Sequence, residues 1–170
     1  EEIKSAYPEA SIETVEADVT DMAAVQAVID HTVAKFGRVD VLFNNAGIMP
    51  VNNLSKLAHQ EWQQMLDINV KGVLNGIAAA LPVMRKQKFG HVISTSSVLG
   101  YEVLPGYAAY SGTKFAVRAI MEGLREEERQ NSIKTTVIAP GSVKTELFDS
   151  INNKEVRESL KAAQKQPGAE

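Results

Sequence analysis

The stretch Val39-Asp40-Val41-Leu42-Phe43-Asn44-Asn45-Ala46-Gly47 decides the fold. Residues 39–43 form a compact apolar run of the length of a strand. Residues 44–47 combine Asn and Gly, which is typical of a tight turn. The sequence therefore predicts a strand at 39–43 that ends abruptly in a turn, and the flanking segments decide what kind of sheet it joins.

A helix and a further strand are predicted before this run. Thr20 is expected to cap the helix with Asp21 in its first turn, and Gly37 is expected to end it as the C′ residue. Residues 12–17 alternate apolar and polar side chains, as a short strand does. The apolar residues of the helix fall on one face: Met22, Val25, Val28, Ile29, Val33 and Phe36.

Two helices and two strands are predicted after the run. A long helix is expected at 59–88, where Pro82 should kink or restart it. A strand at 91–95, a helix at 107–130 and a strand at 135–139 follow, and the tail at 152–170 is polar. Strands that alternate with helices predict a parallel sheet covered by helices on both faces. Residues 1–170 are expected to form a single domain, or part of one.

The composition excludes several functional classes. The chain has 170 residues, no Cys and a formal net charge of −3. Disulfides and thiolate chemistry are excluded, and no basic run favours nucleic acid or an anionic membrane. The sequence shows neither a signal peptide nor a long uninterrupted apolar stretch, so we expect a cytoplasmic protein. His31, His59 and His91 lie far apart, so no metal site is expected.

Tyr110 and Lys114 form the most informative pair. Of the four tyrosines, only Tyr110 has a Lys four residues later, and side chains at that spacing are neighbours on a helix. A phenol has a pKa near 10, and a neighbouring cation lowers it toward the range of a useful acid or base. Alone, the pattern favours a packed Tyr and a solvated Lys, because Tyr-x-x-x-Lys is common by chance.

The surrounding motifs make the pattern specific. Asn-Asn-Ala-Gly lies at 44–47, Asn-x-x-Gly at 69–72 and Pro-Gly-x-Val-x-Thr at 140–145. Ser97 lies thirteen residues before Tyr110. With these motifs in this order, the chain from about residue 17 to 145 resembles the classical short-chain dehydrogenase/reductase family. The resemblance implies a Rossmann-like, doubly wound parallel sheet in three αβα layers, with the family's N-terminal and C-terminal parts missing.

The resemblance also implies a catalytic set. Tyr110 would be the general acid/base of an NAD(P)-dependent oxidoreductase, which moves a hydride between a nicotinamide cofactor and a carbonyl or secondary alcohol. Lys114 would tune the pKa of Tyr110 and hold the nicotinamide ribose. Ser97 would polarise the substrate carbonyl. Asn69 would interrupt its helix and hold a water that links Lys114 to solvent.

Cofactor and substrate residues are implied in the same way. Asp18 and Val19 would flank the adenine, and Asn45, Ala46 and Gly47 would lie beside the adenosine ribose. Pro140, Gly141, Val143 and Thr145 would cover the nicotinamide. For Asn44, a structural role in the turn is as plausible as ligand contact. The expected substrate contacts, besides Ser97 and Tyr110, are Leu99, Leu104 and Tyr107, and residues 142–165 would form a loop or lid over the substrate.

Several questions stay open at this level. The family's glycine-rich phosphate turn is absent from the chain, so NAD and NADP cannot be distinguished. The family's usual assembly implies a homodimer or homotetramer through the two long helices. A non-catalytic nucleotide-binding scaffold or sensor is one alternative, and a related epimerase or dehydratase is another.

Overall fold

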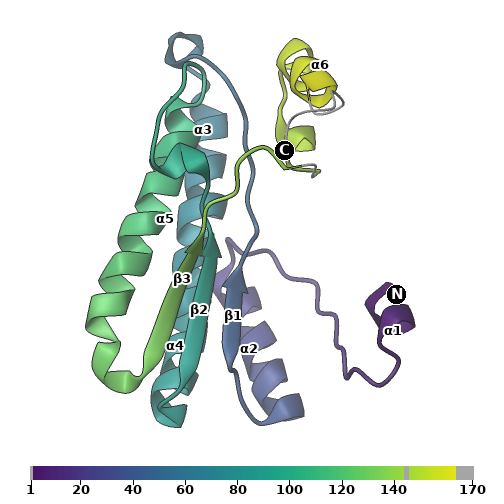
Figure 1. The fold of residues 1–170 in the computed structure, drawn as a ribbon, viewed down its shortest axis with the longest axis vertical. Helices are drawn as coiled ribbons and strands as arrows, with labels where there is room; N and C mark the ends of the chain where they lie inside the picture. Colours follow the sequence, from purple (N-terminus) through teal and green to yellow (C-terminus); the bar gives the residue numbers. More distant parts are fainter. Residues whose placement is uncertain (1, 144–145, 164–170) are drawn as a thin grey trace.

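The computed structural model describes residues 2–143 and 146–163 and centres on a parallel sheet. Three strands, β1 (Val41–Asn44), β2 (Gly90–Thr95) and β3 (Ile133–Ile138), pair in the order β1-β2-β3. Figure 1 shows the arrowheads of all three strands pointing to the same end of the molecule. The loops that follow the strands therefore gather there, as expected for a ligand site in a parallel sheet.

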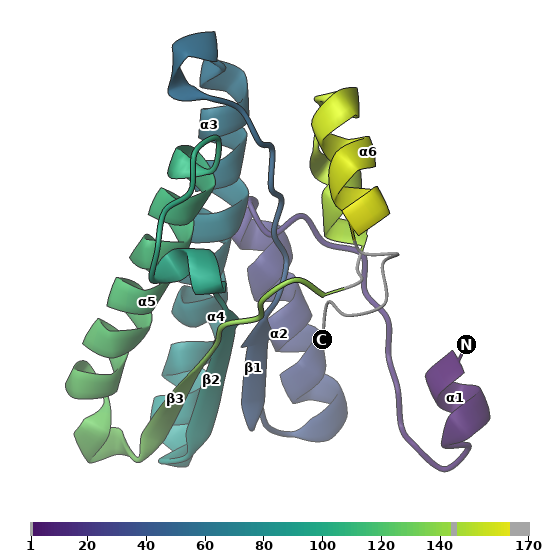
Figure 2. The same cartoon turned by 45° about the horizontal axis from the view of Figure 1, so that its top comes forward.

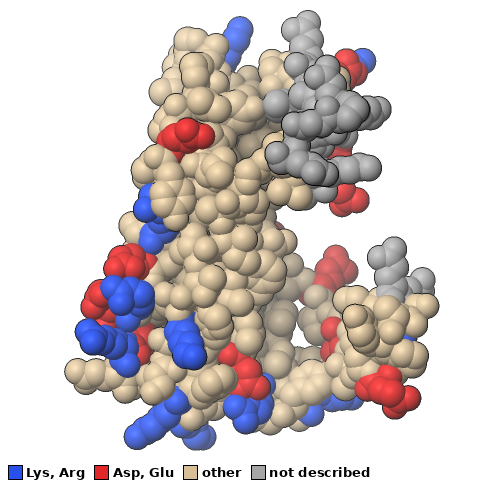
Figure 3. All heavy atoms as spheres, viewed as in Figure 1, with Lys and Arg blue, Asp and Glu red and all other residues tan. Residues whose placement is uncertain are grey.

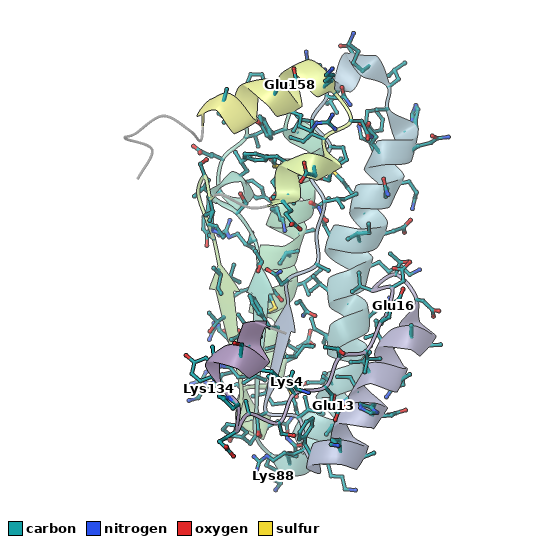
Figure 4. The ribbon with its side chains drawn as sticks, turned by 90° about the vertical axis from the view of Figure 1, so that its right-hand side faces the viewer. Lys4, Glu13, Glu16, Lys88, Lys134 and Glu158 are labelled. Atoms are coloured by element: carbon teal, nitrogen blue, oxygen red, sulfur yellow. The ribbon has the colours of Figure 1, made fainter. Side chains whose placement is uncertain are left out.

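The strand expected at 12–17 is not present, and this prediction is wrong. A short helix, α1 (Glu2–Ala6), precedes this segment, which carries no sheet pairing in the structure. Alternating polarity favours a strand only where a neighbouring strand offers hydrogen-bond partners. Instead, Glu13 forms an ion pair with Lys35 at 3.0 Å, and Figure 4 shows Glu13 beside α2 (Met22–Phe36).

Local capping defines α2 at both ends. Asp21, rather than the expected Thr20, is the N-cap, because its carboxylate accepts hydrogen bonds from the backbone N–H groups of Ala23 and Ala24. Gly37 ends the helix with φ of 78°, which confirms the predicted C′ glycine.

The long helix predicted at 59–88 forms three continuous segments. These are α3 (His59–Met65), a π-helical turn (Leu66–Lys71) and α4 (Gly72–Gln87), which runs through Pro82 without ending. By length and composition alone, the whole run is apolar enough to cross a membrane. Here it packs on the sheet instead, since the inner face of α4 contributes Val73, Ile77 and Met84 to the core.

Helices cover one face of the sheet in the described residues. The core joins α2, α4 and α5 (Ala108–Glu127) to inward side chains of the strands, among them Val92. Val41, Phe43 and Ile138 point to the other face and are 54%, 52% and 42% exposed. Figure 4 shows Lys134 on that side, away from α2 and α4, and Figure 3 shows few charges over the middle of this face.

The expectation that both faces are covered is therefore not met within residues 2–143 and 146–163. The reason is topological. Successive strands β1, β2 and β3 are added in one direction, and right-handed crossovers then put every connecting helix on the same side. Covering the second face requires the strand order to reverse, and the three strands described contain no reversal.

Close contacts set the depth of the helices against the sheet. A Cβ at Gly76 of α4 would overlap the side-chain oxygen of Asn44. The NH₂ group of the same Asn44 amide donates a hydrogen bond to the Ser94 hydroxyl at 3.3 Å. At the far end, Glu128 is fully buried and accepts hydrogen bonds from Arg85 and Asn131. This cluster ties the end of α5 to the end of α4.

Short elements complete the structure. Those beyond the strand tips are the 3-10 turns η1 (Leu54–Lys56), η3 (Val98–Gly100) and η5 (Glu146–Ser150) and the helix α6 (Lys154–Ala163). The 3-10 turn η4 (Arg129–Asn131) lies at the opposite end of the sheet, between α5 and the start of β3. Figure 2 shows α6 at the same end of the molecule as α3, beyond the strand tips, with α1 at the opposite end.

Candidate active site

Asn69 occupies the π-helical turn and is 1% exposed. Its side-chain oxygen accepts a hydrogen bond from the Ile48 N–H, and its NH₂ group donates to the Ile48 carbonyl, both at 2.9 Å. The NH₂ group also donates to the Thr113 hydroxyl at 3.1 Å. Asn69 therefore fixes the segment that follows β1 against the turn of α5 that carries the proposed acid/base pair.

Gly47 leaves space beside this amide. A Cβ at Gly47 would lie 3.4 Å from Asn69 Oδ1 and 3.6 Å from Lys114 Nζ. Both distances correspond to van der Waals contact, so three chain segments converge at Gly47. Next to it, the Asn45 side-chain oxygen accepts a hydrogen bond from the Thr95 hydroxyl at 2.9 Å.

Tyr110 and Lys114 lie together in the first part of α5, as predicted. Tyr110 is 3% exposed and Lys114 is 5% exposed. The ammonium Nζ lies 5.6 Å from the centroid of the Tyr110 ring and donates a hydrogen bond to the Thr95 carbonyl at 2.9 Å. The ammonium thus reaches past the ring toward the tip of β2.

Burial dominates the acidity of both groups. It raises the pKa of Tyr110 above its usual 10, although a hydrogen bond from Ser97 acts in the opposite direction. Burial also lowers the pKa of Lys114 to about 8. The net direction differs from the expected lowering, because burial raises the pKa of Tyr110 more than Ser97 lowers it. The expected effect of Lys114 on this pKa stays a prediction.

Ser97 lies at the tip of β2, where it caps η3. Its hydroxyl accepts a hydrogen bond from the Leu99 N–H at 3.1 Å and lies near enough to the Tyr110 phenol to act on its pKa. Ser97 is 8% exposed. The hydroxyl and the phenol are therefore close enough to act on one substrate atom.

Asp18 and Val19, for which the resemblance implies an adenine contact, lie just before α2 and next to α4. Asp18 accepts a hydrogen bond from the Thr20 N–H at 2.8 Å, which is the main reason that its pKa is lowered. The Val19 carbonyl accepts from Asn75 at 2.8 Å, and Val19 packs on Gly72. A cavity of about 400 Å³ opens beside Asp18. Its other lining residues were not predicted: Thr20, Gln60, Gln63, Gln64, Asp67 and Ile68.

The segment after β3 is placed only in part. The Pro140 carbonyl accepts a hydrogen bond from the Val98 N–H at 3.0 Å, which joins this segment to η3. Gly141 and Val143 are exposed. Thr145, the last predicted contact of the nicotinamide loop, lies outside the described residues.

An apolar cluster contains Tyr110. Leu99 is buried in it and Tyr107 packs against it, whereas Leu104 is 46% exposed and is not one of its members. The segment predicted as a lid contributes Ile151 to this cluster, together with Leu147, Phe148 and Val156. Of residues 142–165, those at 144, 145, 164 and 165 lie outside the described part.

Two contacts hold this segment to the main body. The Met49 N–H donates to the Ser150 hydroxyl at 2.8 Å. The Glu61 carboxylate accepts hydrogen bonds from Asn152 at 2.7 Å and from Asn52 at 2.5 Å. Sequence patterns gave no signal for Glu61 or Thr113, because their partners are distant in the chain.

Known proteins share both the sequence and the arrangement. A family model described as short chain dehydrogenase matches residues 1–156. An uncharacterized oxidoreductase of Staphylococcus saprophyticus is 49% identical over 162 residues, which cover 94% of this chain and 66% of the relative. The chain thus spans slightly less than two thirds of that relative's length.

Solved structures give the same result. A short chain dehydrogenase/reductase from Burkholderia phymatum in complex with NAD has a TM-score of 0.82 and 31% identity, over 91% of this chain and 56% of that one. A gluconate 5-dehydrogenase from Burkholderia cenocepacia in complex with NADP and tartrate has a TM-score of 0.75 and 31% identity, over 82% and 55%.

Proposed function

Because the chain belongs to the short-chain dehydrogenase family, we propose that it carries the proton-transfer machinery of an NAD(P)-dependent oxidoreductase. The reaction class is interconversion of a carbonyl and a secondary alcohol. The observation that carries the proposal is the burial of Tyr110, Lys114 and Ser97 around one point beyond the tip of β2.

The residues fit a nicotinamide cofactor. Among the described residues, the Thr95 carbonyl is the acceptor for Lys114 Nζ, so two of the three ammonium protons are left for ribose hydroxyls. The bare backbone at Gly47 leaves room beside that ammonium. The cofactor supplies or accepts the hydride when it is bound. Of the two similar solved structures, one is in complex with NAD and the other with NADP, so the proposal does not choose between NAD and NADP for this chain.

Side chains of the protein transfer the proton. In the direction of reduction, the Tyr110 phenol donates its proton to the carbonyl oxygen of the substrate, and the Ser97 hydroxyl donates a hydrogen bond to the same oxygen. The Lys114 ammonium stabilises the phenolate that Tyr110 becomes. In the direction of oxidation, the phenolate takes the proton of the hydroxyl group.

A buried ammonium favours catalysis over a purely structural role. Holding Lys114 charged in a buried site is costly, as its lowered pKa shows, and a scaffold protein gains nothing from that cost. Perturbed pKa values of this kind cluster at functional sites. This argument favours an enzyme over a non-catalytic nucleotide sensor.

The substrate class follows from the apolar cluster. Leu99, Tyr107, Leu147 and Phe148 lie in or against the cluster that contains Tyr110. We propose a ketone, an aldehyde or a secondary alcohol with apolar bulk, enclosed by the 142–165 segment. We also propose self-association through the two long helices, where Leu74 and Phe115 are exposed. Light scattering of the full-length protein tests this second proposal.

The test of the reaction is Tyr110→Phe in the full-length protein. We expect turnover of an apolar carbonyl panel, followed by the absorbance of the reduced cofactor, to fall roughly 100-fold to 10,000-fold while cofactor binding persists. Tyr7→Phe is the matched control, because Tyr7 is 68% exposed. Undiminished turnover in Tyr110→Phe would refute the mechanism. Cofactor binding without turnover by the parent protein would favour a sensor, and turnover without net change in free cofactor would favour an epimerase or dehydratase.

A further inference from the structure

Thr113 lies between Tyr110 and Lys114 and is 2% exposed. Its hydroxyl donates a hydrogen bond to the Tyr110 carbonyl at 2.7 Å and accepts one from Asn69 Nδ2 at 3.1 Å. The first bond is common for a Thr in a helix, because the hydroxyl can reach a carbonyl one turn back. The second bond crosses from α5 to the π-helical turn.

The directions of these bonds are fixed by proton counting. A Thr hydroxyl has one proton, and the Tyr110 carbonyl takes it, so toward Asn69 the hydroxyl can only accept. The amide of Asn69 is therefore oriented with its NH₂ group toward Thr113. Reversing the amide would face its NH₂ group to the Ile48 N–H and its oxygen to the Ile48 carbonyl, which is unfavourable at both places.

The bond therefore joins the three segments that converge at the site. One hydroxyl links the turn of α5 that carries Tyr110 to the turn that carries Asn69, and Asn69 in turn holds Ile48, which follows Gly47. Asn69 Oδ1 and Lys114 Nζ both border the space beside Gly47. A change in the orientation of the Asn69 amide would thus alter the surroundings of the ammonium.

We infer that Thr113 is a positioning residue: its hydroxyl holds the Asn69 amide and the π-helical turn in the register at which Tyr110, beside Lys114, exchanges a proton with the substrate. This inference rests on the proposed function. Thr113 acts through Asn69 and Tyr110 and is not itself a catalytic residue. Its hydroxyl is required for this role, whereas its methyl group is not.

The test compares Thr113→Val, Thr113→Ala and Thr113→Ser in the full-length protein. The Val and Ala variants leave a buried Asn69 N–H without an acceptor, and this strain is relieved by movement of the amide or the turn. For both we expect kcat to fall roughly tenfold to a hundredfold, with a KM for the substrate within about threefold of the parent, as expected when transition-state interactions are lost. The pH profile of kcat should shift as well.

The Ser variant keeps the hydroxyl and should restore kcat to within about threefold, with the pH profile of the parent. Thr32→Val is the matched control, because the Thr32 hydroxyl also bonds to a carbonyl of its own helix, that of Val28, at 2.8 Å. This control should leave kcat and the pH profile unchanged. If Thr113→Val is insoluble, the comparison of Ala with Ser decides.

Two results would overturn the inference. One is a kcat and a pH profile of Thr113→Val or Thr113→Ala equal to those of the parent. The other is an equal loss in Thr113→Ser and Thr113→Ala, which would assign the effect to packing of the methyl group. Tyr110→Phe is measured in parallel. If it stays active, the proposed function fails, whereas an inactive Tyr110→Phe beside fully active Thr113 variants refutes the role of Thr113 alone.

Discussion

Replacing Lys114 by Met should make the protein more stable at neutral pH while removing its activity. The side chain is 5% exposed, and burial lowers its pKa from 10.5 to about 8. At about 1.36 kcal/mol per pKa unit, the folded state therefore carries a cost of about 3 kcal/mol for the charged form. Met has the same unbranched shape and no charge, so Lys114→Met removes this cost.

The lost hydrogen bond to the Thr95 carbonyl offsets part of the gain, by about 1 kcal/mol. The net expectation at pH 7 is a gain of about 2 kcal/mol in the free energy of unfolding. The gain depends on pH, because the pKa of Lys114 is lower in the folded than in the unfolded state. As the pH rises through about 8, the folded protein loses this proton first, the cost is relieved, and the parent becomes more stable.

The assay is urea unfolding of the cofactor-free, full-length protein and its variant at pH 7 and at about pH 9.5. The advantage of Lys114→Met should shrink by about 2 kcal/mol between these two conditions. Burial also raises the pKa of Tyr110 and Tyr107, which opposes the trend above about pH 10, but this contribution is common to both proteins. A variant less stable than the parent at pH 7, or an advantage independent of pH, would refute the reasoning.

Two further predictions concern packing and the lid. Gly76→Ala should lower the free energy of unfolding by about 1–3 kcal/mol, because the new Cβ would overlap the Asn44 side chain. Gly112→Ala should raise the free energy of unfolding by about 0.5–1 kcal/mol, because the space around Gly112 is open and Ala favours a helix. Calorimetry of both variants checks this pair, and equal effects would contradict it. In Glu61→Ala, Asn152 loses its hydrogen-bond acceptor, so the 146–163 segment should be cleaved faster by a protease. The KM for the substrate should rise several-fold at unchanged kcat. An unchanged KM in steady-state kinetics would contradict this prediction.

The elements governed by local chemistry could be predicted from the sequence. Gly37 ends α2 with the positive φ that only glycine adopts without strain, and Tyr110 and Lys114 lie together because of helical spacing alone. The segment at 12–17 was not predictable in this way, because a strand depends on a partner from another part of the chain. Covering the second face of the sheet also depends on strands elsewhere in the chain, because it requires a reversal of the strand order that the three described strands do not contain.

The residues of the candidate site could be predicted from motifs, whereas their surroundings could not. Asn69, Ser97, Tyr110 and Lys114 were named from motifs, and the structure brings them to one end of the sheet. The resemblance implies a helix interruption at Asn69, but the apolar pattern does not indicate the π-helical turn found there, because one extra residue in a turn disturbs that pattern too little. The raised pKa of Tyr110 was missed because burial is a property of the whole fold.

The contact between Asn44 and Gly76 has a consequence for how the sheet assembles. Residues 41–43 are apolar at every position, so their pattern does not indicate which side chains belong inside. A slip of one residue would cost little in apolar burial, but it would move the Asn44 amide away from Ser94 and from the gap at Gly76. The contacts of Asn44 with Ser94 and Gly76 therefore favour one register of β1 against β2 and α4 over a register shifted by one residue.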